Sequence, residues 1–182
     1  MEDLLNNNPI VLEESQLPQR STTVEKYSSD IDSLRRFTAS HCDEDLVDDD
    51  DTFEPIDNQE VFDLIKHVHD PEHPLTLAQL AVVSLDRISI NDTGKTDTIA
   101  GVHIEITPTI THCSLATLIG LGLRVRLDRS LSPRFRTKIT VTPGSHQSES
   151  QVNKQLNDKE RVAAACENSQ LLKVVEDMLA HC

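Results

Sequence analysis

The stretch ITPTITHCSLATLIGLGLRVRL, residues 106–127, decides the fold because its hydrophobic period changes from two to about 3.6 within it. Apolar residues alternate from Ala100 to Ile106, which is typical of a half-buried strand. Beyond Ser114 they recur at helical spacing, at Leu115, Leu118, Ile119 and Leu123. The sequence therefore predicts a strand that ends at Pro108 and a helix that runs to about Leu127, with Cys113 at the junction.

Upstream of this stretch, the sequence predicts a helix and a second strand. Asp57 and Glu60 have the spacing of a capping box. Apolar residues follow at helical spacing, namely Val61, Phe62, Leu64, Ile65 and Val68. The two prolines of DPEHP (70–74) end that helix. VVSLDRISI (82–90) alternates like a strand, and a polar turn around Gly94 would join it to the next strand as a hairpin.

Downstream, the sequence predicts a third strand and two more helices. The strand contains Phe135, Ile139 and Val141 and ends at Pro143–Gly144. One helix covers about 151–167, with Val152, Leu156, Val162 and Ala163 inward, and another covers about 170–180. The order helix, two strands, helix, strand, two helices indicates an α+β fold. Its small three-stranded sheet, with a hairpin, is covered by about four helices.

Residues 1–56 differ in composition from the rest of the chain. Residues 1–60 hold 17 Asp or Glu and 4 Lys or Arg, a balance of −13 within a net charge of −14. Few large apolar residues accompany the acidic block DEDLVDDDD (43–51). We therefore expect a disordered acidic tail over 1–56 and a folded domain over 57–182. The tail either solubilises the protein or docks on a basic partner surface.

The composition argues against several functional classes. Acidic charge repels nucleic acid, and an aromatic content of 3% leaves few surfaces on which bases stack. No window approaches 18 apolar residues, so we expect no membrane insertion. The four cysteines form no C-x-x-C pair, which excludes the usual zinc ribbon and gives no disulfide framework. Without a secretory signal, they indicate a reducing cytosol or nucleus.

Cys113 is the main candidate for chemistry. A thiol at a strand-to-helix junction lies near the free N–H groups and the positive dipole end of the helix. Such a setting lowers the pKa of a cysteine and makes the thiolate a nucleophile or metal ligand. The alternative is a small apolar side chain that fills a gap under the helix. The neighbouring His112 is a weak candidate for a catalytic base, because sequence neighbours rarely face one another.

His67, His69 and His73 cluster at the end of the first predicted helix. Three histidines in seven residues could bind a metal ion, but no cysteine or carboxylate of obvious spacing completes a tetrahedral site. Histidines that interact with the last carbonyl groups of a helix are the more common case.

Six cations within fifteen residues form a second candidate surface: Arg124, Arg126, Arg129, Arg134, Arg136 and Lys138. Part of this run is expected at a helix C-terminus and on the outward face of a strand. The run would also suit a basic face for an acidic partner or for the chain's own tail.

The sequence from Asp70 to about Leu172, more than half of the chain, resembles the eukaryotic cytosolic iron–sulfur assembly component 2 family. That family is related to bacterial SufT-like and PaaD-like proteins. The matching stretches are DPEHPLTLAQL (70–80), TPTITHCSLATLIGL (107–121), RSLSPRF (129–135), VTPG (141–144) for the family's ITPG, and VNKQLNDKERVAAACEN (152–168). Thr111 replaces a common proline and Ile106 an aromatic residue, which suggests a diverged paralogue.

The resemblance implies a non-catalytic adaptor of the cytosolic iron–sulfur targeting complex, with a link to chromosome segregation. Its partners would be a WD-repeat β-propeller protein, a HEAT-repeat scaffold and apo-proteins such as helicases and polymerases, in the cytoplasm and the nucleus. The family's reactive cysteine corresponds to Cys113, with Thr107, Pro108, His112 and Ser114 as motif neighbours. Cys113 would be a transient cluster ligand, with no cofactor stably bound. Whether the protein forms a homodimer is left open.

The main rival is an interaction module that links a helicase or polarity-type partner without iron chemistry. It predicts that Cys113 is dispensable. A cysteine hydrolase is the remaining alternative, and it requires a base that the sequence does not reveal.

Overall fold

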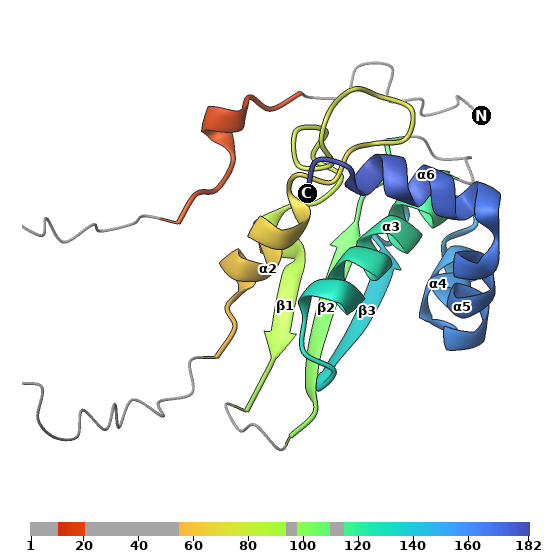
Figure 1. Ribbon diagram of the computed structural model, residues 1–182. Helices are drawn as coiled ribbons and strands as arrows, with labels where there is room; N and C mark the ends of the chain where they lie inside the picture. The colour runs from red at the N-terminus through yellow and green to blue at the C-terminus, as the bar shows by residue number, and fades with distance from the viewer. Residues whose placement is uncertain (1–10, 21–54, 94–97, 110–114) are drawn as a thin grey trace, which may run out of the picture.

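The computed structural model describes residues 11–20, 55–93, 98–109 and 115–182. Within these ranges, five α-helices and a three-stranded sheet form the α+β fold that the sequence predicts (Figure 1). The helices are α2 (Asn58–Ile65), α3 (Leu115–Ser130), α4 (Glu149–Asn157), α5 (Lys159–Glu167) and α6 (Ser169–Leu179). The strands are β1 (Ile88–Asn91), β2 (Ala100–Ile106) and β3 (Phe135–Val141). Two 3₁₀ turns, η1 (Glu14–Gln16) and η2 (Leu85–Arg87), complete the elements.

The sheet has the order β1-β2-β3 and is mixed. β1 pairs antiparallel with β2, with Ile88 opposite Ile104, which confirms the predicted hairpin. β3 pairs parallel with β2 from Ala100–Phe135 to Ile106–Val141. Because β2 and β3 are parallel, α3 is the crossover between them, and the carboxyl ends of both strands lie at the same edge of the sheet.

One face of the sheet is buried against helices. Alternate side chains of β2 and β3 are buried from Ala100 to Ile106 and from Phe135 to Val141. Figure 1 shows α3 lying across this face, with α4 and α5 beside β3 and α6 running past the upper part of α3. The alternate residues, such as His103 and Lys138, point to the opposite face and remain accessible. The alternation read from the sequence therefore decides which face carries the core.

Helix α3 packs unusually close to its neighbours at two glycines. A Cβ atom placed on Gly120 would lie 2.4 Å from Cδ1 of Leu156 on α4. One placed on Gly122 would lie 2.9 Å from the terminal methyl of Met178 on α6. Leu156 and Met178 are both buried. The glycines, which weaken a helix by about 1 kcal/mol each relative to alanine, are thus explained by close packing.

The outer edge of β3 is covered by polar side chains. Oδ1 of Asn153 accepts a hydrogen bond from the backbone N–H of Val141 (2.7 Å). Asn157 accepts from the N–H of Ile139 and donates its Nδ2 to the Ile139 carbonyl (2.8 Å). These backbone groups of Ile139 and Val141 are therefore satisfied by α4, not by another strand.

The second predicted strand is shorter than the sequence suggested. Strand geometry covers Ile88–Asn91, whereas the prediction was 82–90. The backbone N–H groups of Val82 and Val83 both donate to the carbonyl of Leu77, which draws them into a turn. The polar turn expected around Gly94 lies partly outside the described residues.

Two predicted helices also differ in extent. The first ends at Ile65, before the prolines, because His69 donates its backbone N–H to the Met178 carbonyl and leaves the helical path. The helix predicted over 151–167 is divided at Asp158, whose carboxylate caps α5 by accepting from the N–H groups of Glu160 and Arg161. Ala163, predicted to face inward, is exposed on α5.

Part of the predicted tail contacts the domain. Leu17 is buried with 8% of its surface exposed, and the N–H of Leu12 donates to the Gln79 carbonyl (2.8 Å). Arg20 forms ion pairs with Asp57 and Glu60 at the start of α2. Composition did not indicate this contact. The boundary between tail and domain at residue 57 remains a prediction.

We predict that Gly120→Ala lowers the free energy of unfolding by about 1–3 kcal/mol, because the added methyl overlaps the buried Leu156. Urea unfolding of the purified protein measures this change.

Gly101→Ala is the matched control, because nothing lies within 4 Å of its added methyl. The free energy of unfolding of the Gly122→Ala variant should fall between those of the other two variants, since the end of the Met178 side chain can move. Equal stability of the Gly120→Ala and Gly101→Ala variants would contradict the packing explanation.

Candidate functional site

The carboxyl ends of β2 and β3 are joined by an arginine. Nη1 of Arg87, on η2, donates hydrogen bonds to the hydroxyl oxygens of Thr107 and Thr142. The two hydroxyl groups also lie 2.9 Å apart, and the Thr142 hydroxyl donates to the Ile106 carbonyl. We call Arg87, Thr107 and Thr142 the arginine–threonine clamp. It ties the hairpin to both parallel strands at the point where the chain leaves β2.

The backbone at this position is also fixed. The N–H of Thr107 donates to the Val82 carbonyl (2.9 Å), and the N–H of Thr142 donates to the Ile106 carbonyl (2.8 Å). Thr107 is therefore held through both its backbone and its side chain, and the next residue, Pro108, is buried. A positive charge thus lies beside the first residue of the connection from β2 to α3.

The central residue of the predicted site, Cys113, lies outside the described residues, as do His112 and Ser114. The structure fixes the chain on both sides of them, at Thr109 and at Leu115, where α3 begins. The Oγ1 atom of Thr109 is buried and has no hydrogen-bond partner among the residues that the structure describes. Buried polar atoms without a partner are uncommon in native structures.

Asp70 begins the DPEHP segment and has a fully buried side chain. Its Oδ1 accepts the backbone N–H groups of Glu72 and His73 and lies 3.1 Å from Nδ1 of His73. Its Oδ2 is buried and without a partner within the described ranges. This carboxylate shapes the turn, a role that neither the two prolines nor the motif match of the segment indicated.

The three histidines considered as metal ligands separate into different roles. His73 pairs with Asp70, whereas the ring of His69 packs edge-on against that of His181, with centroids 4.9 Å apart. His67 is exposed. In the described part of the chain, no group of three or more His, Cys, Asp or Glu side chains is placed to hold a metal ion.

Three of the six predicted basic-face residues bond within the chain, each to a different part of the fold. Arg124 pairs with Asp128 and donates to the Thr137 carbonyl on β3. Arg126 donates to the Leu64 carbonyl on α2. The side chain of Arg134 makes two hydrogen bonds to Asp92, at 2.9 and 2.6 Å, which raise the pKa of its guanidinium.

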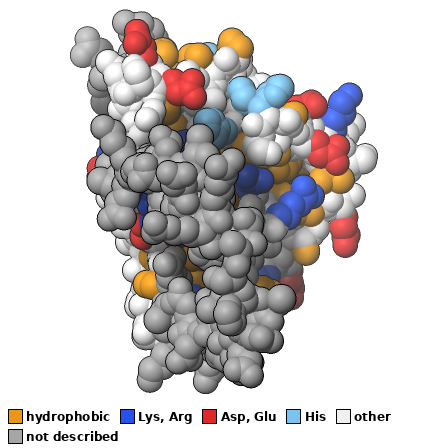
Figure 2. Space-filling model, turned by 60° about the vertical axis from the view of Figure 1, so that its left-hand side comes forward, with side chains coloured by type: hydrophobic (Ala, Val, Ile, Leu, Met, Phe, Trp, Pro, Cys, Tyr) orange, Lys and Arg blue, Asp and Glu red, His pale blue; other side chains and the backbone are white. Residues whose placement is uncertain are grey.

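The remaining three, Arg129, Arg136 and Lys138, are exposed. On the part of the surface visible in Figure 2, Lys and Arg side chains are interspersed with acidic and hydrophobic ones. A basic face made by all six residues remains a prediction, and Arg129, Arg136 and Lys138 are its exposed members.

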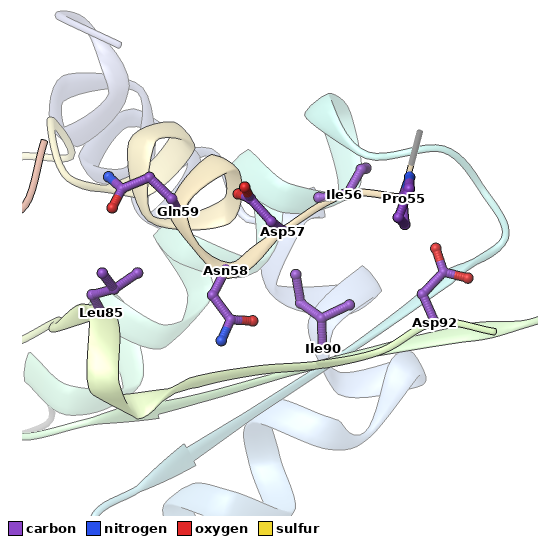
Figure 3. Close-up of a pocket in the computed structure, with 8 residues that line it drawn as sticks. All are labelled: Pro55, Ile56, Asp57, Asn58, Gln59, Leu85, Ile90 and Asp92. Atoms are coloured by element: carbon purple, nitrogen blue, oxygen red, sulfur yellow. The ribbon is translucent and has the colours of Figure 1, made fainter. Parts of the chain in front are cut away.

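A hollow of about 530 Å³ lies between the start of α2 and β1 (Figure 3). In Figure 3, Leu85 and Ile90 lie on the strand side and Asp57, Asn58 and Gln59 on the helix side. Its two carboxylates are already used, since Asp57 caps α2 and Asp92 binds Arg134. The hollow therefore offers no unpaired acid for catalysis.

Two other cysteines are described. Cys166 on α5 is half-buried, and Cys182 at the C-terminus is exposed. Partial burial nevertheless raises the pKa of the Cys182 thiol, and the charge of Arg126 opposes that shift. At neutral pH, Cys182 is consequently a poor nucleophile.

Comparison with known proteins shows the family of the chain. Residues 58–148, which include α2, the sheet and α3, match the family model described as iron–sulfur cluster assembly protein. The chain belongs to this family. A MIP18 family protein of Saccharomyces cerevisiae is 47% identical over 230 aligned positions that cover 100% of both chains.

Animal members of the iron–sulfur cluster assembly family are similarly close. The MIP18 family protein galla-2 of Drosophila melanogaster is 55% identical, over 80% of this chain and 86% of the relative. Cytosolic iron-sulfur assembly component 2B of Mus musculus is 53% identical, over 80% of this chain and 83% of the relative. The resemblance stated from the motifs is thereby confirmed.

The clamp is the part of the site that sequence reasoning missed. Arg87 was assigned to a strand, where it carried no role. A usable signal was present, because Thr107 and Thr142 each follow directly after the last buried residue of a strand. Recognition that the two strands are parallel would have placed both threonines at one edge.

We predict that Arg87→Met lowers the free energy of unfolding by about 1–3 kcal/mol, because hydrogen bonds from a charged donor are lost. Amide hydrogen exchange at Thr107 and Thr142 should accelerate, since the strand ends lose their tie. Arg129→Met, at an exposed position, should change stability by less than about 0.5 kcal/mol. Unchanged exchange at Thr107 in the Arg87 variant would show that the clamp does not hold the strand ends.

Proposed function

We propose that this protein is a non-catalytic adaptor in cytosolic iron–sulfur protein maturation, which helps to deliver clusters to apo-proteins. The proposal is supported by family membership and by relatives in Mus musculus and Dictyostelium discoideum, both named cytosolic iron-sulfur assembly component 2B. These relatives are 53% and 48% identical to this chain, over 80% and 72% of its length. Their names also favour a cytosolic location.

The observation that carries the proposal for Cys113 is the position of the arginine–threonine clamp. Arg87 is fixed at Thr107, six residues before Cys113. The first turn of α3, whose N–H groups and dipole favour an anion, begins at Leu115, two residues after it. The helix start favours a thiolate close to it, which is the form of cysteine that binds iron, and the clamp fixes the point from which this connection leaves β2.

A single thiolate cannot hold a cluster by itself, since iron–sulfur clusters usually take four cysteine ligands. Cys113 would therefore be a transient ligand, with the remaining ligands from a partner, a client or a second copy. In this scheme the cluster is cargo and not a resident cofactor.

The partners we propose are a WD-repeat β-propeller protein, a HEAT-repeat scaffold and apo iron–sulfur clients such as helicases and polymerases. Some clients would be nuclear, and this is where a link to chromosome segregation would arise. The exposed Arg129, Arg136 and Lys138 offer cationic positions for an acidic partner surface.

The same exposed cations also support the rival function, an interaction module without iron chemistry. The two functions differ in what they require of Cys113. The adaptor needs its thiol for cluster handover, whereas the interaction module needs only the folded surface.

We predict that Cys113→Ser leaves the fold and the propeller and scaffold contacts intact but lowers the cluster content of client enzymes several-fold. The measurement is affinity purification under low oxygen, with partners identified by mass spectrometry and client iron determined in parallel. Undiminished client iron in the variant would favour the interaction module.

Cys166→Ser is the control for the loss of a half-buried thiol, and it should leave client iron unchanged. Alkylation at neutral pH adds a direct test, because Cys113 should react much faster than Cys182, whose thiol has a raised pKa. Comparable rates for Cys113 and Cys182 would contradict an activated thiolate.

A further inference from the structure

The segment Val11–Arg20 is bound to the domain as a peptide would be. Leu17 inserts beside Phe62 and Val83, and its surface is only 8% exposed. The N–H of Leu12 donates to the Gln79 carbonyl (2.8 Å), and Nε2 of Gln59 donates to the Pro18 carbonyl (3.2 Å). Leu17 and the partly buried Leu12, which packs against the same core, are the two apolar anchors of the segment. Apolar anchors combined with hydrogen bonds to the main chain are typical of short peptide recognition. We call the surface formed by Phe62, Ala78, Ala81, Val83 and Leu85 the docking groove.

The shape of the docking groove includes a strained residue. Ala81 has a φ of 53°, in the left-handed region where glycine is usual. It stands at the C′ position of a Schellman turn, in which Val82 donates to the Leu77 carbonyl and Ala81 to that of Ala78. Glycine would relieve the strain, but it would remove the methyl that lines the groove. The strained Ala81 therefore also contributes to the surface on which the segment lies.

The contacts at the two ends of the segment are largely exposed to solvent. Arg20 binds Asp57 and Glu60 at 3.0 and 3.4 Å, but its side chain is 56% exposed, and exposed ion pairs stabilise little. Val11 is 51% exposed and contributes no anchor. A largely apolar hollow of about 500 Å³ remains between the segment and the domain, lined by Leu17 and Leu85 among others. The leucine anchors therefore do not fill the groove.

We propose that the docking groove is a peptide-binding site, and that residues 11–20 of the same chain are its exchangeable occupant. We infer binding in cis from the ion pair between Arg20 and Asp57, which lie at the two ends of the stretch that joins the segment to the domain. Tethering of this kind gives an effective concentration of about 1 mM. A peptide with a dissociation constant of about 0.1 mM would then occupy the groove about nine-tenths of the time. The free state would be accessible to the same peptide in trans.

The test uses the full-length protein, in wild-type form and as the Leu17→Asp variant, and a labelled synthetic peptide with the sequence of residues 11–20. We expect the variant to bind this peptide, as followed by fluorescence anisotropy, about tenfold more tightly than the wild type. The reason is that the wild-type groove is already occupied in cis. In the same variant, hydrogen exchange of the Leu12 amide should accelerate, whereas exchange in β2 and β3 should not change.

Val11→Asp is the matched control, because it adds the same charge to an exposed position of the segment. It should bind the peptide as weakly as the wild type. Leu12→Pro removes the N–H that bonds to Gln79 and should open the groove without adding charge. It therefore keeps the test decisive if the Leu17→Asp variant does not fold.

Three results would overturn the proposal. One is that no folded variant with a released segment binds the peptide more tightly than the wild type. Another is that the wild-type Leu12 amide exchanges as fast as in the Leu17→Asp variant. The third is a wild-type protein whose mass in solution doubles with concentration while the segment passes between isotopically labelled copies, because the occupant would then be bound in trans.

Discussion

The fold depends on the burial of α3 from almost every side. Its buried residues surround the helix axis, as expected of a helix enclosed by a protein core. α3 contacts β3 on the sheet side and α2, α4 and α6 on the others. Gly120 and Gly122 provide the space for Leu156 and Met178. The helices around α3 are thus positioned by it, and a change in the packing of α3 affects the whole domain.

The same element places the candidate site. Because α3 is the crossover between two parallel strands, it starts at the edge where β2 and β3 both end. That edge receives Arg87 from the hairpin, and the clamp fixes the chain just before the segment that contains Cys113. The fold therefore fixes the chain on both sides of the connection that contains Cys113, at Thr107 and at the start of α3.

The spacing of apolar residues and the capping signals were sufficient to predict the elements near the core. The strand at 100–106, the helix after Ser114 and the capping box at Asp57 all follow local rules, and all three are confirmed. The errors arose where long-range contacts override local pattern. Val82 and Val83 alternate like a strand but are held in a turn by Leu77, and Asp158 interrupts a continuous helical pattern because its side chain caps α5.

The site was predictable only in part. Motif resemblance pointed to Cys113, which lies outside the described residues, but a single sequence does not show that Arg87 reaches two threonines 20 and 55 positions away. The docking of residues 11–20 was missed for a similar reason. Composition averages over a window, whereas Leu17 is buried as one side chain in a polar stretch.

The two asparagines of α4 that bond to the edge of β3 have a consequence for self-association. An open strand edge invites pairing with a strand of another molecule, and proteins commonly block such edges with charge, proline or a bulge. Here Asn153 and Asn157 occupy the hydrogen-bonding positions themselves. Edge-to-edge sheet growth through β3 would first have to break these bonds. Any assembly of this protein on that side must therefore use helix surfaces, and the edge is protected from the pairing that begins amyloid-like aggregation.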